Sequence, residues 1–138
     1  MSEDIAKAPR HLWVVGILSL LWNLTGAAVY TLTMMRDPRA LDGADPQMVA
    51  AIDASPVWAT GAWALGVWAA LAGSILLLAR RRLAVTAFGV SLLGLAVVGG
   101  YEYVVRMPTN LAQNLAIWLI ALLVWLYARA IAERGVLR

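Results

Sequence analysis

Long apolar blocks separated by short polar segments dominate the pattern of this chain. The clearest block covers residues 57–79, contains no charged residue and is followed directly by Arg80, Arg81 and Arg82. A helix needs about 20 consecutive apolar residues to cross the hydrocarbon core of a bilayer. Residues 12–35, 83–105 and 110–130 form three more mostly apolar blocks of sufficient length. The pattern therefore predicts a single all-α domain, residues 1–138, built as a bundle of four transmembrane helices.

The connection between the first two blocks, residues 36–56, is expected to contain a short helix of its own. Asp45 can cap a helix that begins at Pro46, because a side-chain oxygen at the N-cap accepts from a free amide and proline suits the first helical position. Such a helix places three apolar residues on one face: Met48, Val49 and Ile52. We expect an amphipathic segment that lies on the outer membrane surface or over the mouth of the bundle.

Two further capping signals stand where later spans begin. Ser55 and Pro56 repeat the same arrangement and predict Ser55 as the N-cap of the second span. Asn110 and Gln113 have the spacing of a capping box, which would satisfy the first free amides of the fourth span. Residues 36–38, by contrast, read Arg-Asp-Pro and indicate a break in the chain after the first span.

The distribution of positive charge predicts the orientation of the four spans. Short loops rich in lysine and arginine stay in the cytoplasm. One side would hold Lys7, Arg10, Arg80, Arg81, Arg82, Arg129, Arg134 and Arg138, and the other side Arg36, Arg39 and Arg106. We therefore expect a multi-pass protein of the bacterial cytoplasmic (inner) membrane, with both termini in the cytoplasm.

The first apolar block also has features of a signal peptide. It runs past the usual length of such a segment, so we expect it to be retained.

Composition excludes several classes of function. The chain is 62% hydrophobic and 14% charged, whereas a soluble domain carries nearer a quarter charged residues. The absence of cysteine excludes disulfides and thiolate metal sites, and the single histidine, His11, is expected at the membrane interface. Basic residues beside apolar spans argue against nucleic acid as a partner. No set of catalytic groups, metal ligands or phosphate-binding glycines is present, so we expect no enzyme activity and no cofactor or metal.

Two polar residues inside the spans are candidate sites, because ionisable and amide groups in lipid need partners. Glu102, near the outer end of the third span, either belongs to a ligand, proton or cation site or pairs with Arg106, four residues later on the same face. The spacing favours the ion pair. Asn23, near the middle of the first span, either hydrogen-bonds to another helix or binds a ligand in a central cavity, and packing is favoured.

Two tryptophans, Trp22 and Trp68, lie near mid-membrane by residue count, away from the interfacial positions that tryptophan usually takes. Their rings either pack between helices and towards lipid, which we favour, or line an aromatic pocket for flat solutes such as sugars. Because Asn23 and Trp68 share one depth, we form the hypothesis that they face a common cavity. Together with Glu102, these residues are the candidate ligand or helix-contact residues.

The second span carries a ridge of small residues spaced by four: Ala62, Gly66, Ala70 and Ser74. Small residues at this spacing let the backbone of another helix come close in the membrane. We therefore interpret the ridge as a helix-packing surface.

Several short motifs run through most of the chain. They read LWNLTG at residues 21–26, PVWATGAWA at 56–64, GS at 73–74, LLL at 76–78, RRR at 80–82 and SLLG at 91–94. In these motifs the chain resembles a group of small four-span bacterial inner-membrane proteins, mostly uncharacterised, some of which are labelled sugar transporters. The resemblance implies a four-span fold in the inner membrane. The chain lacks the first-span acid of the small multidrug-resistance exporters, so we do not expect drug–proton exchange.

Two functions agree with these observations. The first is a small membrane protein that acts through helix association, as a homo-oligomer or as an accessory subunit of a membrane complex. The alternative is a small-solute transporter, with a sugar among the candidates, that works as an oligomer because four helices enclose little volume. The expected partners are the lipid bilayer and either further copies of the chain or another membrane protein.

Overall fold

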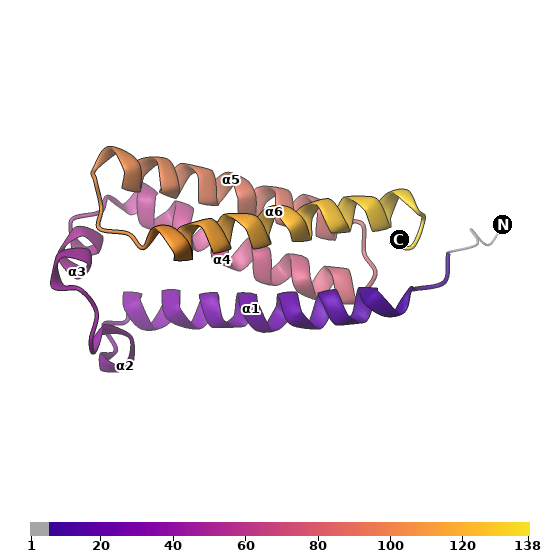
Figure 1. Cartoon of the computed structure of the whole chain (residues 1–138), viewed down its shortest axis with the longest axis horizontal. Helices are drawn as coiled ribbons and strands as arrows, with labels where there is room; N and C mark the ends of the chain where they lie inside the picture. The colour runs from indigo at the N-terminus through magenta and orange to yellow at the C-terminus, as the bar shows by residue number, and fades with distance from the viewer. Residues whose placement is uncertain (1–5) are drawn as a thin grey trace.

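All four predicted spans are long helices in the computed structural model, which describes residues 6–138. They are α1 (Arg10–Met34), α4 (Val57–Leu78), α5 (Leu83–Val104) and α6 (Leu111–Glu133), and they form an elongated bundle (Figure 1). Each is long and apolar enough to cross a membrane. The described residues contain helices and no strand, so the all-α four-helix bundle is confirmed. α1 begins at Arg10 rather than residue 12, and α6 continues to Glu133 rather than ending near residue 130.

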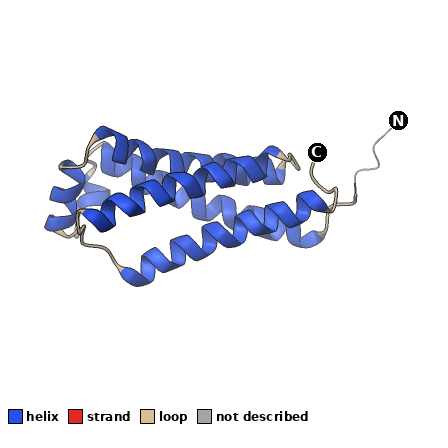
Figure 2. Cartoon of the chain, turned by 90° about the horizontal axis from the view of Figure 1, so that it is seen from above, coloured by secondary structure: helices blue, strands red, loops and turns tan. Residues whose placement is uncertain are grey.

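The bundle has two different ends. The first described residues, the C-terminus and the turn between α4 and α5 lie at one end, which we call the terminal end (Figure 1). Two short helices, α2 (Pro38–Leu41) and α3 (Pro46–Asp53), lie at the opposite end, which we call the loop end (Figures 1 and 2). This arrangement places the segments before α1 and after α6 at the same end of the bundle, as an even number of spans requires.

Two of the predicted caps are confirmed. The Asp45 side chain accepts a hydrogen bond from the amide of Gln47 at 2.8 Å, with Pro46 as the first residue of α3. The Asn110 side chain accepts from the amide of Gln113 at 3.1 Å and so caps α6. In both cases a side-chain oxygen satisfies an amide that has no partner within the helix.

The prediction for Ser55 is wrong. Pro56 is itself the N-cap of α4, and no side chain caps this helix. The hydroxyl of Ser55 instead donates to the carbonyl of Ala51 at 2.9 Å, at the end of the preceding helix. Because the proline stands one position before the first helical residue, Ser55 lies outside the cap.

The sequence analysis missed α2. Residues 36–38 do end α1, but Asp37 then caps a new single-turn helix that begins at Pro38. The same signal correctly predicted α3 at Asp45 and Pro46. A proline after an aspartate therefore begins a short helix at both places in this connection.

All four spans end in the same way. The residue after each C-cap has a positive φ: 58° at Arg36, 57° at Arg80, 54° at Arg106 and 70° at Gly135. In each case its amide and the next amide bond to the carbonyls of the last turn, as in a Schellman motif. Three arginines thus occupy a position where glycine is favoured, at a cost of about 1–2 kcal/mol each for the left-handed conformation.

The helices pack in sequence order around the bundle. α1 packs on α4, α4 packs most extensively on α5, and α5 packs on α6, whereas the backbones of α6 and α1 scarcely approach each other. The close contact between α4 and α5 depends on Gly66 and Gly94. A Cβ on Gly94 would lie 2.7 Å from the backbone nitrogen of Gly66 and 2.8 Å from the carbonyl oxygen of Ala62. Ser91 adds a hydrogen bond of 2.6 Å to the carbonyl of Gly66.

The apolar core lies at the terminal end. It consists of Leu12, Leu77, Ala84, Phe88, Ala128, Ile131, Ala132, Val136 and Leu137. The buried residues of α6 all belong to this core, and they occupy its last two turns. The bundle is therefore tightly packed at the terminal end and looser towards the loop end.

Candidate functional site

A large cavity occupies the looser part of the bundle. It measures about 880 Å³, and we call it the central cavity. All four spans contribute to its lining, among them Trp22, Asn23 and Val29 of α1, Trp63 and Val67 of α4, Phe88, Leu95 and Glu102 of α5, and Gln113, Trp118 and Ala121 of α6. A volume of about 300–1,000 Å³ is usual for a pocket that holds a small molecule. The central cavity is the candidate functional site.

The two ends of the central cavity differ in chemistry. Near the loop end its lining includes the charged side chains of Glu102 and Arg106 and the amides of Gln113 and Asn114. Towards the terminal end aliphatic and aromatic side chains replace them, and Phe88 joins the cavity to the apolar core. The cavity therefore has a charged mouth and a mostly apolar interior, in which Asn23 and Ser91 are polar lining residues.

The central cavity lies beside the place where the bundle is not closed. α1 and α6 both line it, yet their backbones scarcely approach each other, and the contacts given for them lie at the terminal end, where His11 bonds to Tyr127 and Leu12 joins the apolar core. We call the gap between them the α1–α6 seam. Of the described α6 residues, none before Ala128 is buried. The seam exists because α6 packs only loosely on the bundle along most of its length.

Asn23 belongs to a polar cluster between α1 and α4. Its amide nitrogen donates to Ser74 Oγ at 2.8 Å and lies 3.2 Å from Ser19 Oγ and 3.3 Å from the carbonyl oxygen of Ala70. Ser19 and Ser74 also bond to each other at 2.7 Å, and Ser74 donates to the carbonyl of Ala70 at 3.0 Å. Since the hydroxyl of Ser74 has one proton, Ser19 is the donor in the bond between the serines. The amide of Asn23 therefore hydrogen-bonds across the contact between α1 and α4.

Asn23 also borders the central cavity. The carbonyl of Ala70 can only accept, so the nitrogen end of the Asn23 amide faces α4. The described hydrogen bonds of Asn23 use this nitrogen alone. Its oxygen is therefore the atom that remains for a molecule in the cavity.

The structure separates the two mid-membrane tryptophans. Trp22 lines the central cavity and is 43% exposed. Trp68 is 47% exposed and is not among the residues that line this cavity in the described chain. Asn23 and Trp68 therefore do not share this cavity, and the hypothesis of a common cavity is wrong. Trp63 and Trp118, which the sequence analysis did not single out, do line the cavity.

Glu102 and Arg106 both line the mouth of the central cavity, but they form no ion pair among the described residues. The i,i+4 argument requires both residues to be on one helix. α5 ends at Val104, and the positive φ of Arg106 takes the chain off the helix axis. The ion pair favoured from the spacing is thus absent, and both charged groups face the mouth separately.

The small-residue ridge of α4 contacts two helices instead of one. Ala62 and Gly66 lie against Gly94 of α5. Ala70 and Ser74 instead bond to Asn23 of α1. A spacing of four drifts around an α-helix, which has 3.6 residues per turn, so the two halves of the ridge face different neighbours.

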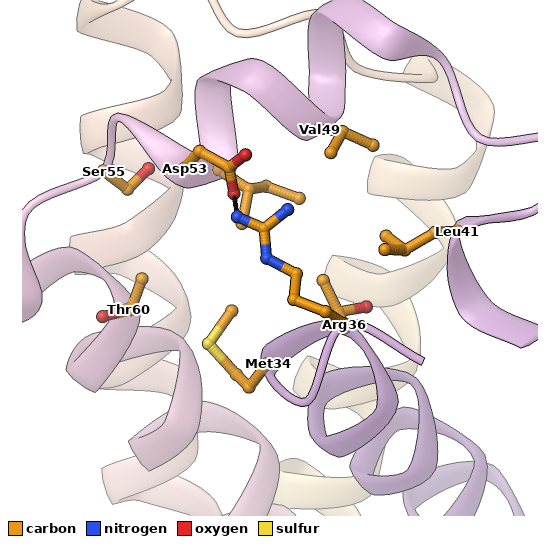
Figure 3. A pocket seen from close by; sticks show the side chains of 9 residues that line it. Met34, Arg36, Leu41, Val49, Asp53, Ser55 and Thr60 are labelled. Atoms are coloured by element: carbon orange, nitrogen blue, oxygen red, sulfur yellow. Dashed lines mark hydrogen bonds and ion pairs between the residues drawn. The ribbon is translucent and has the colours of Figure 1, made fainter. Parts of the chain in front are cut away.

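A second, smaller cavity of about 250 Å³ lies at the loop end (Figure 3). Arg36 at the end of α1 forms an ion pair with Asp53 at the end of α3, and both residues line this cavity (Figure 3). Val49 and Ile52 line it too, so the apolar face of α3 covers the ends of α1 and α4. The expected amphipathic helix therefore lies over the bundle rather than apart from it.

Arg80 is a residue whose role the sequence analysis missed. Its guanidinium donates to the carbonyls of Ala6 at 2.6 Å and Val136 at 3.1 Å, and its own carbonyl accepts from the amide of Arg138 at 2.7 Å. One side chain of the arginine run thus joins the start of the chain, the α4–α5 turn and the C-terminal segment. At the same end His11 bonds to the hydroxyl of Tyr127.

The described residues contain no group of three or more histidine, cysteine, aspartate or glutamate side chains that could hold a metal ion. The chain matches no protein-family model, and no similar curated protein or solved structure was found.

Proposed function

We propose that this chain is a non-enzymatic protein of the bacterial inner membrane that acts through helix association, with further copies of itself or as an accessory subunit of a larger membrane complex. The observation that carries the proposal is the α1–α6 seam. Helices in lipid gain stability from close packing against one another. A transmembrane helix of a second molecule at the seam would give α6 the contacts that it lacks along most of its length.

The orientation that we propose has both termini in the cytoplasm. The arginines of the α4–α5 turn and those that follow α6 lie at the terminal end, together with the first described residues. Short loops of this composition are retained on the cytoplasmic side. The loop end, with α2 and α3, would then face away from the cytoplasm. The resemblance to four-span bacterial inner-membrane proteins supports the same membrane.

Native mass spectrometry of the protein, extracted gently from its own host membrane, tests this proposal. We expect a homo-oligomer or a stoichiometric complex with another membrane protein. The mass distinguishes these two cases directly, and the identity of a partner would name the process that the protein serves. A strictly monomeric protein, with no associated chain at several detergent concentrations, would contradict helix association.

A second candidate function is a small-solute carrier that works as an oligomer. The specific observation in its favour is the central cavity, with the free oxygen of Asn23 and the carboxylate of Glu102 on its lining. If the protein is a carrier, liposomes that contain the purified protein should take up a solute in a saturable way. Sugars are the first solutes to test. Asn23→Leu should then abolish uptake without changing assembly, and Glu102→Gln should remove any pH dependence. Uptake that equals that of protein-free liposomes for every solute tested would dismiss this candidate.

A further inference from the structure

The central cavity is long as well as large. Phe88 and Glu102 both line it and lie on α5, so that they are about 20 Å apart at a rise of about 1.5 Å per residue. This distance is a large part of the thickness of one bilayer core, which is about 30 Å. The molecule that fills such a cavity is elongated along the bundle axis.

Polar groups are concentrated at one end of this long cavity. The mouth holds Glu102, Arg106, Gln113 and Asn114, whereas the interior is mostly apolar, with Asn23 and Ser91 among its few polar residues. The hydroxyl of Ser91 donates to a carbonyl of α4, and the amide nitrogen of Asn23 also bonds to α4. Water fills such an interior poorly, because each buried water needs two to four polar partners. The lining therefore suits a molecule with one polar end and one apolar chain.

The charges at the mouth restrict the polar end further. Glu102 and Arg106 contribute one negative and one positive charge, and no ion pair or hydrogen bond in the described part of the chain joins their side chains to each other. A head group with a net charge would be attracted by one and repelled by the other. An uncharged head group with hydroxyls can accept from the guanidinium and donate to the carboxylate at the same time.

We propose that the central cavity binds a single-chain amphiphile, with an uncharged hydrogen-bonding head group between Glu102 and Arg106 and its chain extending towards Phe88. A volume of about 880 Å³ lies within the range of pockets for one drug-sized molecule, which a two-chain phospholipid exceeds. In a single copy of the protein, the α1–α6 seam leaves the cavity open towards the bilayer, so such a chain can enter before another helix packs at the seam. This inference does not depend on helix association.

The tryptophans of the protein provide a direct test. Trp22, Trp63 and Trp118 line the central cavity, and the remaining four do not: Trp13, Trp58, Trp68 and Trp125. The probe is a monoacylglycerol with a brominated chain, because bromine quenches indole fluorescence on contact. Two variants are prepared in lipid nanodiscs, one with phenylalanine at the three lining positions and one with phenylalanine at the four others.

The variant that keeps the lining tryptophans should show saturable quenching with one probe per protein. The other variant should show only the gradual quenching of probe dissolved in lipid. Equal, non-saturable quenching in both variants would overturn the proposal. A brominated fatty acid and a brominated alkylammonium of equal chain length test the head group, and equal or tighter binding of either would overturn the assignment of an uncharged head.

A single cavity-filling substitution tests the same proposal without the multiple tryptophan substitutions. Ala121→Phe places a ring in the cavity, and Ala96→Phe makes the same change at a similar depth on the exposed face of α5. Since overpacking is unfavourable, Ala121→Phe should raise the apparent Kd for the probe about tenfold or more, with Ala96→Phe unchanged. Equal effects of the two would contradict binding in the cavity.

A separate experiment identifies the source of the amphiphile. Native mass spectrometry without added probe identifies a bound molecule that comes from the host membrane. An adduct that forms after addition of the monoacylglycerol, and in no other preparation, indicates a molecule taken up from outside. Absence of an adduct in both preparations would overturn the proposal.

Discussion

The amide of Asn23 shows how one polar side chain is accommodated at mid-membrane depth. Its nitrogen lies within 3.3 Å of three oxygens from α1 and α4, and two serines complete the cluster. An unsatisfied amide in hydrocarbon is costly, so this cluster fixes the relative position of the two helices. The sequence predicted the packing role from the depth of Asn23, but it did not identify Ser19 and Ser74 as the partners.

Asn23→Leu should lower the stability of the bundle by about 1 kcal/mol or less, because hydrogen bonds between membrane helices contribute this much. The serines keep their mutual bond, which limits the loss. Thermal unfolding in one detergent measures the effect. Thr25→Val is the control, since the hydroxyl of Thr25 bonds within its own helix at 3.0 Å to Leu21. If both variants lose the same stability, the cluster does not join α1 to α4.

Gly94→Ala should destabilise the bundle by about 1–3 kcal/mol, the usual range for overpacking. Its Cβ would meet the backbone of Gly66 and Ala62, which cannot move as a flexible side chain would. Gly100→Ala is the matched control on the same helix, because a Cβ added there would meet no atom within 4 Å. Unfolding of both variants in detergent gives the comparison. Equal stability of the two would show that α4 and α5 do not approach as closely as described.

At the scale of the elements, sequence patterns predicted helix starts better than helix ends. The caps at Asp45 and Asn110 depend on local side-chain chemistry, which the sequence displays directly. The ends depend on a residue with positive φ, and three of the four are arginine, for which no local signal exists. The missing ion pair of Glu102 and Arg106 has the same cause, since the helix ends before the second residue.

The stability of α2 depends on pH, because the carboxylate of Asp37 caps this helix. The Arg39 guanidinium, through its hydrogen bonds, and the Arg39 amide lower the pKa of Asp37 from 3.8 to about 2. A lowered pKa in the folded state stabilises the α2 cap fully above pH 3.8, and this contribution disappears as the pH falls through about 2. Arg39→Met should raise the pKa of Asp37 towards 3.8, measured from the carboxyl chemical shift during a pH titration. An unchanged pKa would contradict the pairing.

Arg80→Ala should destabilise the terminal end by about 1–3 kcal/mol, because the carbonyls of Ala6 and Val136 lose their donor. Arg81→Ala is the control, because it removes an equal charge from the same turn and so has the same effect on membrane orientation. The side chain of Arg81 is exposed, so its loss should lower the stability of the protein only slightly. Hydrogen exchange of the Val136 and Arg138 amides reports the difference. Exchange that rises equally in both variants would assign the effect to charge rather than to these contacts.

At the scale of the whole molecule, the hydrophobic blocks were sufficient to predict four long helices and their order along the chain. They could not predict the α1–α6 seam, because an apolar face towards lipid and one towards a helix have the same composition. The exclusion of Trp68 from the central cavity and the inclusion of Trp63 and Trp118 depend on helix rotation, which residue count does not give. For the same reason the candidate site was predicted only in part, at Trp22, Asn23 and Glu102.

The absence of cysteine allows the central claim, helix association at the seam, to be tested with single cysteine variants. Val29→Cys lies on the lining of the central cavity, on the α1 side of the seam, and is 51% exposed as valine. Val97→Cys on α5 makes the same change at a similar depth, away from the cavity, where valine is 42% exposed. Each cysteine carries a benzophenone photocrosslinker, and the protein is irradiated in its host membrane.

We expect the Val29→Cys protein to form adducts with another protein chain, either a second copy or a partner, and the Val97→Cys protein to react with lipid. The mass of the adduct identifies which chain enters the seam. Equal protein adducts from both positions, or adducts with lipid alone from both, would contradict helix association at the α1–α6 seam.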